Sequence, residues 1–153
     1  MRLSMSRRLA ILGCLVVLGC SDSLEPEEVA GLYVFEQVGS EALPAVIWES
    51  EERTVWVTSG SIRLRADGSG TISGAEQSIS RQDGLPPTNT GYSERPIRFR
   101  TDGLRIEIEI VCAPNESCLP PPHLVARPTP GGLRVSYFEL RTPLHYARVD
   151  ETE

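Results

Sequence analysis

The sequence predicts an all-β protein, a single antiparallel up-and-down β-barrel of about eight or nine strands, and three observations support this fold class. Short runs in which apolar and polar residues alternate repeat from residue 29 almost to the end of the chain. Gly, Pro, Asp and Asn separate these runs, and no stretch shows a convincing helical period. Each run has only one apolar face, which suits a sheet that closes around a single core.

Residues 1–19 are expected to be an export signal that does not belong to the folded domain. Arg2, Arg7 and Arg8 precede an apolar run that is too short to span a bilayer comfortably. The run ends in Val-Leu-Gly-Cys at residues 17–20, which resembles the lipobox of bacterial lipoproteins. The resemblance implies cleavage before Cys20, a diacylglycerol group on its sulfur and acylation of the new amino group. Ser21 in the next position implies sorting to the outer membrane.

Three alternatives for this leader stay open. A second lipobox-like run ends at Cys14, but only about five apolar residues precede it, fewer than the roughly seven that a signal peptide needs. Ordinary signal cleavage would leave Cys20 as a plain thiol. The pair Arg7-Arg8 is also compatible with twin-arginine export, although residues 9–11 match that consensus poorly.

The residues that follow the leader are expected to form a tether and one domain. Residues 20–28 are polar, acidic and interrupted by Pro26, which predicts a lipidated flexible tether before a domain at 29–153. The whole chain has 15 basic and 21 acidic residues. Loss of the three leader arginines makes the mature chain still more acidic, which argues against nucleic acid as a partner. All basic residues are Arg, so chemistry that depends on Lys is excluded.

We expect about nine strands in the domain. They fall at residues 32–38, 45–49, 54–66, 70–80, 92–100, 104–111, 124–127, 133–140 and 144–149. The clearest lies in residues 104–110, where aliphatic and charged residues alternate without interruption.

Two hairpins are expected from their turn residues. A two-residue turn at Asp102-Gly103 would join the strands on either side of it. Its register would pair Phe99 with Ile106, Ile97 with Ile108, and Arg98 with Glu107. A three-residue loop ending at Gly68 would bring Ile62 against Ile72, with Asp67 as a turn former. Gly60 predicts a bulge or bend.

Cys112 and Cys118 are the two cysteines that remain after the leader and Cys20. Pro114 lies between them and favours a turn, so an oxidising compartment predicts a disulfide that closes a short local loop. The alternative is a metal site completed by His123, but no fourth ligand is evident, so no metal is expected.

Several segments in chain order resemble a lipocalin-like (calycin-type) small bacterial lipoprotein over residues 29–149. They are Val-Ala-Gly-Leu-Tyr at 29–33, Ala-Leu-Pro at 42–44, the segment 59–68, and Tyr-Ala-Arg at 146–148. Lipocalins open with Gly-x-Trp and end with an Arg that packs over the Trp at the closed end of the barrel. Gly31, Tyr33 and Arg148 occupy these positions here, with Tyr in place of Trp. The resemblance implies that Tyr33 and Arg148 form a cation–π pair that closes the barrel.

No catalytic constellation stands out. The chain lacks a Gly-x-Ser-x-Gly elbow, a His-Glu-x-x-His motif and a phosphate loop. Its two histidines are His123, which lies beside three prolines, and His145, which fits an ordinary half-buried strand residue. The arginines Arg63, Arg65 and Arg98 have glutamate neighbours, so a solvated surface is a better interpretation than an anion-binding strip. We therefore expect a protein that is neither an enzyme nor dependent on a cofactor.

Two functions fit a lipid-anchored protein of the bacterial envelope that faces the periplasm or the cell exterior. The first is binding of a small apolar ligand in the barrel, with Trp48, Trp56 and Tyr137 as candidate lining residues. The alternative is a structural or protein-interaction module without a ligand cavity, which binds an envelope protein through loops 82–90 or 113–122. A filled core would favour the module. The expected partners are thus the membrane, a ligand or an envelope protein.

Overall fold

The structure is a computed structural model that describes residues 23–80, 86–114, 123–137 and 142–150, without the side chains of residues 90, 92, 93 and 137. One short helix, α1 (Pro26–Val29), precedes ten strands. The strands are β1 (Gly31–Val38), β2 (Glu41–Ala42), β3 (Ala45–Glu49), β4 (Arg53–Leu64), β5 (Ser69–Ser80), β6 (Thr88–Asp102), β7 (Arg105–Ile110), β8 (His123–Thr129), β9 (Gly132–Tyr137) and β10 (Leu144–Val149).

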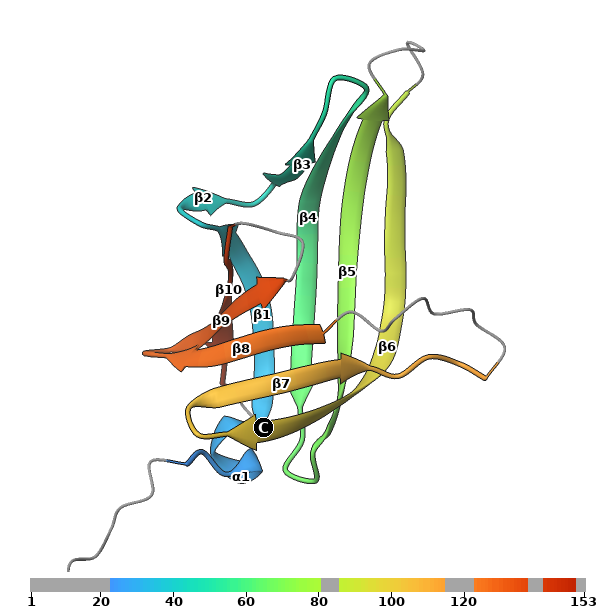
Figure 1. The fold of residues 1–153 in the computed structure, drawn as a ribbon. Helices are drawn as coiled ribbons and strands as arrows, with labels where there is room; N and C mark the ends of the chain where they lie inside the picture. Colours follow the sequence, from blue (N-terminus) through green and yellow to red (C-terminus); the bar gives the residue numbers. More distant parts are fainter. Residues whose placement is uncertain (1–22, 81–85, 115–122, 138–141, 151–153) are drawn as a thin grey trace, which may run out of the picture.

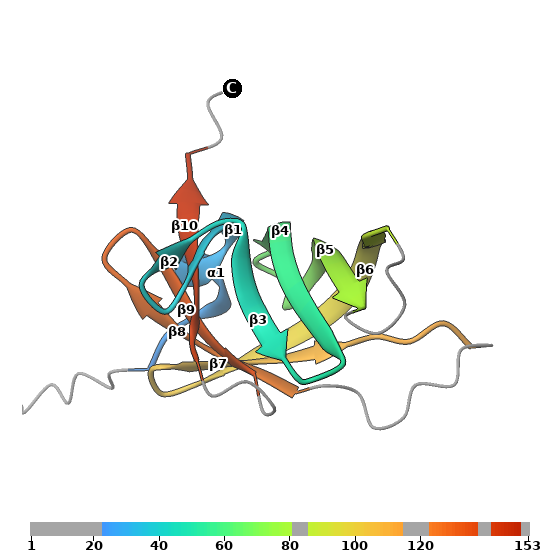
Figure 2. The same cartoon turned by 90° about the horizontal axis from the view of Figure 1, so that it is seen from above.

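Eight of the strands close into an antiparallel up-and-down barrel, so the predicted fold class is confirmed. The neighbours around the ring are β1, β10, β9, β8, β7, β6, β5 and β4, and β1 pairs with β4 to complete it. Figure 2 shows β1, β4, β5 and β6 on one side of the barrel and β7, β8 and β9 on the other. β2 and β3 stay outside the ring and pair with β1 and β4.

The interior of the barrel holds one continuous apolar core. Alternation along each strand sends every second side chain inward, and these side chains form a single buried cluster. Its members include residues from every strand of the ring: Tyr33, Phe35, Ile62, Leu64, Ile72, Ile97, Phe99, Ile106, Ile108, Leu124, Ala126, Leu133, Val135, Leu144 and Tyr146.

The strand predictions hold for all nine runs, and two of them, 45–49 and 144–149, match the observed bounds. β6 begins at Thr88, earlier than the expected residue 92, because it continues its pairing with β5 beyond the barrel. β2 was not predicted, since a two-residue strand leaves no alternation to detect. Residues 138–140 of the expected eighth strand lie outside the described residues.

The hairpin between β6 and β7 forms with a different register from the one predicted. Asp102 pairs with Arg105, so the turn is Gly103-Leu104 and Gly103 has a positive φ of 56°. The observed pairs are Phe99 with Ile108, Ile97 with Ile110, Arg98 with Glu109 and Arg100 with Glu107. The predicted pairs Phe99–Ile106, Ile97–Ile108 and Arg98–Glu107 are therefore wrong. The correct faces are kept because the register differs by two residues, which is one full period of a strand.

The hairpin between β4 and β5 forms as predicted. Ile62 pairs with Ile72, and Gly68 has a φ of 79° at the end of the loop. The Asp67 carboxylate accepts hydrogen bonds from the backbone N–H and the hydroxyl of Ser69, 2.9 and 2.6 Å away. These bonds hold the pKa of Asp67 below its usual value, the hydroxyl bond most of all. A bulge lies at Thr58, two residues before Gly60.

Part of the segment that was expected to be a flexible tether, from Leu24 onward, is folded onto the barrel. The backbone N–H of Leu24 donates to the carbonyl of Gly103 at 3.0 Å, and the side chain packs against the core. Residues 26–29 form α1, whose N-terminus carries a capping box between Glu25 and Glu28. The leader and Cys20 lie outside the described residues. Among the residues that are described, no helix has the length and apolarity needed to cross a bilayer.

Candidate functional site

The two ends of the barrel differ in how the strands are connected. At one end the connections are tight: residues 65–68 between β4 and β5, 103–104 between β6 and β7, and 130–131 between β8 and β9. At the other end they are long: 81–87, 111–122, 138–143, and the excursion through β2 and β3. α1 lies at the tight-turn end, which we call the closed end, and β3 with the far ends of β4, β5 and β6 projects at the open end (Figure 1). Long connections on a rigid barrel are where binding residues concentrate.

A bulge in β3 places Trp48 on the interior side of the open end. Val55 and Val57 alternate with Trp56 along β4, and Val57 belongs to the core, so Val55 and Val57 mark the interior face. Trp48 pairs with Val55, because Ile47 is an extra residue between two regular pairs. Without that extra residue, Trp48 would share the outer face with Val46. The bulge thus brings Trp48 into phase with Val55 and Val57 at the open end, and the residue is 49% exposed.

Polar groups accompany Trp48 on this interior face. Ser78 pairs with Val55 on the side opposite Trp48, and it is buried. The guanidinium of Arg53 donates a hydrogen bond of 2.9 Å to the Ser78 hydroxyl. The mouth therefore combines an exposed aromatic ring with a cation and a hydroxyl, while Ile47 and Leu43 pack below against the core. This arrangement can bind an apolar body that carries a polar tip.

The other two candidate lining residues have different outcomes. Trp56 is half-buried on the outer face of β4, where it pairs with Val46 and Gln77. Trp56 therefore lies on the face opposite to the interior face that it was expected to line. Tyr137 pairs with Leu124 at the end of β9, and its side chain lies outside the described residues.

Below the mouth, the described part of the barrel is closely packed. Seven large side chains on both walls are less than 2% exposed: Ile62, Ile97, Ile106, Ile108, Leu124, Leu133 and Val135. The rings of Phe35 and Tyr146 stack with their centroids 4.8 Å apart and 19° between their planes. These side chains fill the interior as a core would, so a deep ligand chamber is not what this region provides.

The structure brings Tyr33 and Arg148 together at the closed end. The two residues pair across β1 and β10, and the guanidinium carbon lies 5.9 Å from the centre of the Tyr33 ring. Arg148 also donates to the carbonyls of Ala30 at 2.7 Å and Glu28 at 3.5 Å, while the Tyr33 hydroxyl donates to Val29 at 2.8 Å. Burial raises the pKa of Tyr33, and the nearby charge of Arg148 opposes that rise. Together the pair fastens α1 to the barrel.

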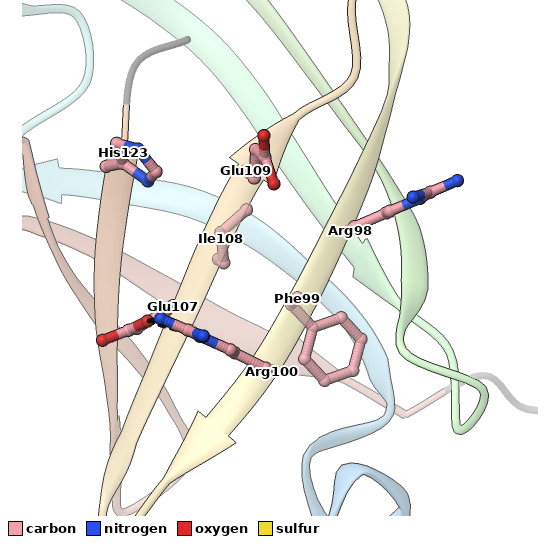
Figure 3. A pocket seen from close by; sticks show the side chains of 7 residues that line it. All are labelled: Arg98, Phe99, Arg100, Glu107, Ile108, Glu109 and His123. Carbon is pink, nitrogen blue, oxygen red and sulfur yellow. Dashed lines mark hydrogen bonds and ion pairs between the residues drawn. The ribbon is translucent and has the colours of Figure 1, made fainter.

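A shallow depression of about 280 Å³ lies over β6, β7 and the start of β8 (Figure 3). Its rim consists of the outward residues Arg98, Arg100, Glu107, Glu109 and His123. Positive and negative side chains lie opposite one another here. The Glu107 carboxylate accepts a hydrogen bond of 2.6 Å from Nε of Arg100, which raises the pKa of that guanidinium. Balanced charge of this kind favours a solvated surface over an anion site.

The Arg100–Glu107 ion pair is expected to contribute little to stability. The Arg100 side chain is 80% exposed, so water and salt screen the attraction. We expect the double-mutant cycle of Arg100→Ala and Glu107→Ala to give a coupling free energy within the experimental error of zero, measured by urea unfolding. A coupling clearly above that error would show that the depression holds the pair in a fixed, desolvated geometry.

The remaining candidate residues that the structure describes lie apart from one another along the sheet. His123 is exposed at the start of β8, and His145 is half-buried in β10 between Gln37 and Arg134. Cys112 follows β7, whereas Cys118 lies outside the described residues, so their disulfide stays a prediction. Within the described ranges, no three His, Cys, Asp or Glu side chains are placed to hold a metal ion.

Comparisons of this chain with protein-family models, with curated proteins and with solved structures find no match.

Proposed function

We propose that this protein is a lipid-anchored protein of the bacterial envelope that binds a small apolar ligand at the open end of a lipocalin-like barrel. The anchor is Cys20, after removal of residues 1–19. The observation that carries the proposal is the bulge at Ile47, which brings the exposed Trp48 into phase with the face that carries the hydrogen-bonded pair Arg53 and Ser78. Bulges commonly re-aim a side chain next to a functional site.

The packed interior limits how far the proposed ligand can enter the barrel. Because Val57 and the residues below it are buried, the ligand lies in the mouth, with its apolar part against Trp48. The fold type and the positions of Tyr33 and Arg148 support the lipocalin-like resemblance.

The two tryptophans of the chain provide a matched test, because they lie on opposite faces of the same sheet. We expect the domain from Leu24 onward to bind the apolar fluorophore N-phenyl-1-naphthylamine with energy transfer from Trp48. With the fluorophore excited directly, because this variant removes the energy donor, Trp48→Ala should weaken binding about 30-fold or more, since an aromatic anchor typically contributes about 2 kcal/mol or more. Trp56→Ala should leave it nearly unchanged. Equal losses in both variants would contradict a site on the interior face.

A second candidate is an interaction module without a ligand cavity, and the packed interior favours it specifically. Native mass spectrometry of the protein purified from its own envelope separates the two functions. A stoichiometric apolar passenger supports ligand binding, whereas an empty domain that retains a protein partner supports the module.

The proposed anchor has its own test. The full chain should incorporate radiolabelled palmitate, Cys20→Ala should abolish the label, and Cys14→Ala should retain it. Retention of the label by Cys20→Ala would move the acylation to the alternative site at Cys14.

A further inference from the structure

We propose that the closed end of the barrel rests on the membrane, with the side chain of Leu104 in the lipid interface. This inference rests on the proposed lipid anchor and adds an orientation: the open end, with Trp48, faces away from the bilayer.

Leu104 is exposed in a way that the fold does not require. It occupies the tip of the β6–β7 hairpin and is 62% exposed, more than the other large apolar side chains that are exposed in the described structure. The turn needs a residue that accepts a positive φ at Gly103, but it sets no demand for an apolar side chain beside it. A single exposed apolar side chain is common on protein surfaces, so the partner of Leu104 is inferred from the chain segment that lies beside it.

The position of the N-terminal segment identifies that partner as the membrane. The backbone of Leu24 is hydrogen-bonded to Gly103, the residue next to Leu104. Four residue steps separate Leu24 from Cys20, and an extended chain of that length spans at most about 14 Å. A lipid attached to Cys20 thus holds the hairpin tip close to the bilayer surface.

The orientation is fixed because the segment is fastened at two points. Besides the Leu24–Gly103 bond, Arg148 holds the carbonyl of Ala30 just after α1. Figure 1 shows α1 beside the β6–β7 turn, at the end opposite the projecting strand β3. The barrel therefore does not hang from a long tether, and only the closed end lies within reach of the lipid.

Electrostatic attraction to anionic lipid does not drive this contact. Acidic groups outnumber basic ones among the exposed residues at this end: Asp67, Asp102, Glu25, Glu27 and Glu28 against Arg65 and Arg105. An acyl anchor raises the local concentration of the barrel at the surface, so one apolar side chain is enough to bias its orientation. We therefore expect the contact to form on vesicles without anionic lipid and not to be strengthened by phosphatidylglycerol.

The experiment uses the full lipidated protein in phosphatidylcholine vesicles with and without phosphatidylglycerol. Leu104→Cys is labelled with the environment-sensitive fluorophore NBD, and Val46→Cys, an exposed apolar position in β3, is the matched control. The unsubstituted protein gives the background from native cysteines. We expect blue-shifted emission at position 104, loss of that emission with nitroxide-labelled lipid, and neither effect at position 46.

An unlabelled variant gives a second measurement. Leu104→Asn should speed tryptic cleavage after Arg105 in the vesicle-bound protein and leave the rate in detergent unchanged. If NBD at position 104 emits as it does in water while the protein still floats with the vesicles, the inference is overturned and the anchor is left intact. A blue shift that depends on protein concentration and ignores the nitroxide lipid assigns Leu104 to a second copy and also overturns it. Failure to float with vesicles overturns both the anchor and the orientation.

Discussion

Ile62→Ala is expected to lower the free energy of unfolding by about 2–5 kcal/mol, among the largest effects of any single substitution in the barrel. Ile62 is completely buried and lies where β4 meets β1, the pairing that closes the ring. It pairs with Tyr33 on one side and with Ile72 on the other, so truncation leaves a cavity that three strands border. Close packing around the site prevents these strands from collapsing into the space.

Ser61→Ala is the matched control for this substitution. Ser61 is the preceding residue of β4 and faces outward at the same seam, where its hydroxyl lies 2.8 Å from that of Ser73. We expect it to cost about 1 kcal/mol or less. Urea unfolding of the two variants measures the difference, at constant m value. If both variants lost the same small amount, the interior at the seam would be loosely filled, and a deep ligand chamber would become the better hypothesis.

The strands of this barrel could be predicted because each buries only one face. Alternation of apolar and polar residues marks such strands directly, as the match at 144–149 illustrates. The register in which neighbouring strands pair was harder to predict. The loop that ends at Gly68 has one reasonable placement, whereas turns at 102–103 and 103–104 both send Phe99 and Ile108 inward. Contacts far away in the sequence, such as Leu24 with Gly103, distinguish the two, and no local pattern contains them.

The candidate site could be predicted in part. The resemblance predicted that Tyr33 and Arg148 meet at the closed end. In the structure they do, because they lie on the first and last strands of the ring, which are neighbours. Trp48 and Trp56 looked equivalent in the sequence. They differ because one extra residue at Ile47 shifts the phase of β3, and the run Ala-Val-Ile-Trp-Glu has no alternation that would reveal a bulge. α1 has four residues, too few for a helical period.

Arg148→Met is expected to lower the free energy of unfolding by about 1–2 kcal/mol, because a charged hydrogen bond is lost from an exposed site. Met keeps most of the apolar stem of Arg, so the loss reports the guanidinium and its bonds to Ala30 and Glu28. α1 should then open more readily, and hydrogen exchange of residues 26–31 should accelerate before the barrel unfolds.

Arg134→Met is the matched control, since Arg134 is exposed on β9 and no ion pair or hydrogen bond of its side chain occurs in the described structure. We expect a change within about 0.5 kcal/mol there. Equal stability and equal exchange in the two variants would mean that Arg148 does not fasten α1.

The pH dependence of stability distinguishes the charge of Arg148 from its packing. Burial raises the pKa of Tyr33 in the folded state. The neutral Tyr33 side chain therefore contributes to folded-state stability below about pH 10, and this contribution is lost as the pH rises further. Arg148 lowers the same pKa, and its removal should therefore steepen the alkaline loss of stability. Thermal unfolding between neutral and strongly alkaline pH measures this slope, with Arg134→Met beside it. If Arg148→Met gave the slope of the control, the contact at the closed end would be one of packing alone, and the orientation of α1 would not depend on the charge above Tyr33.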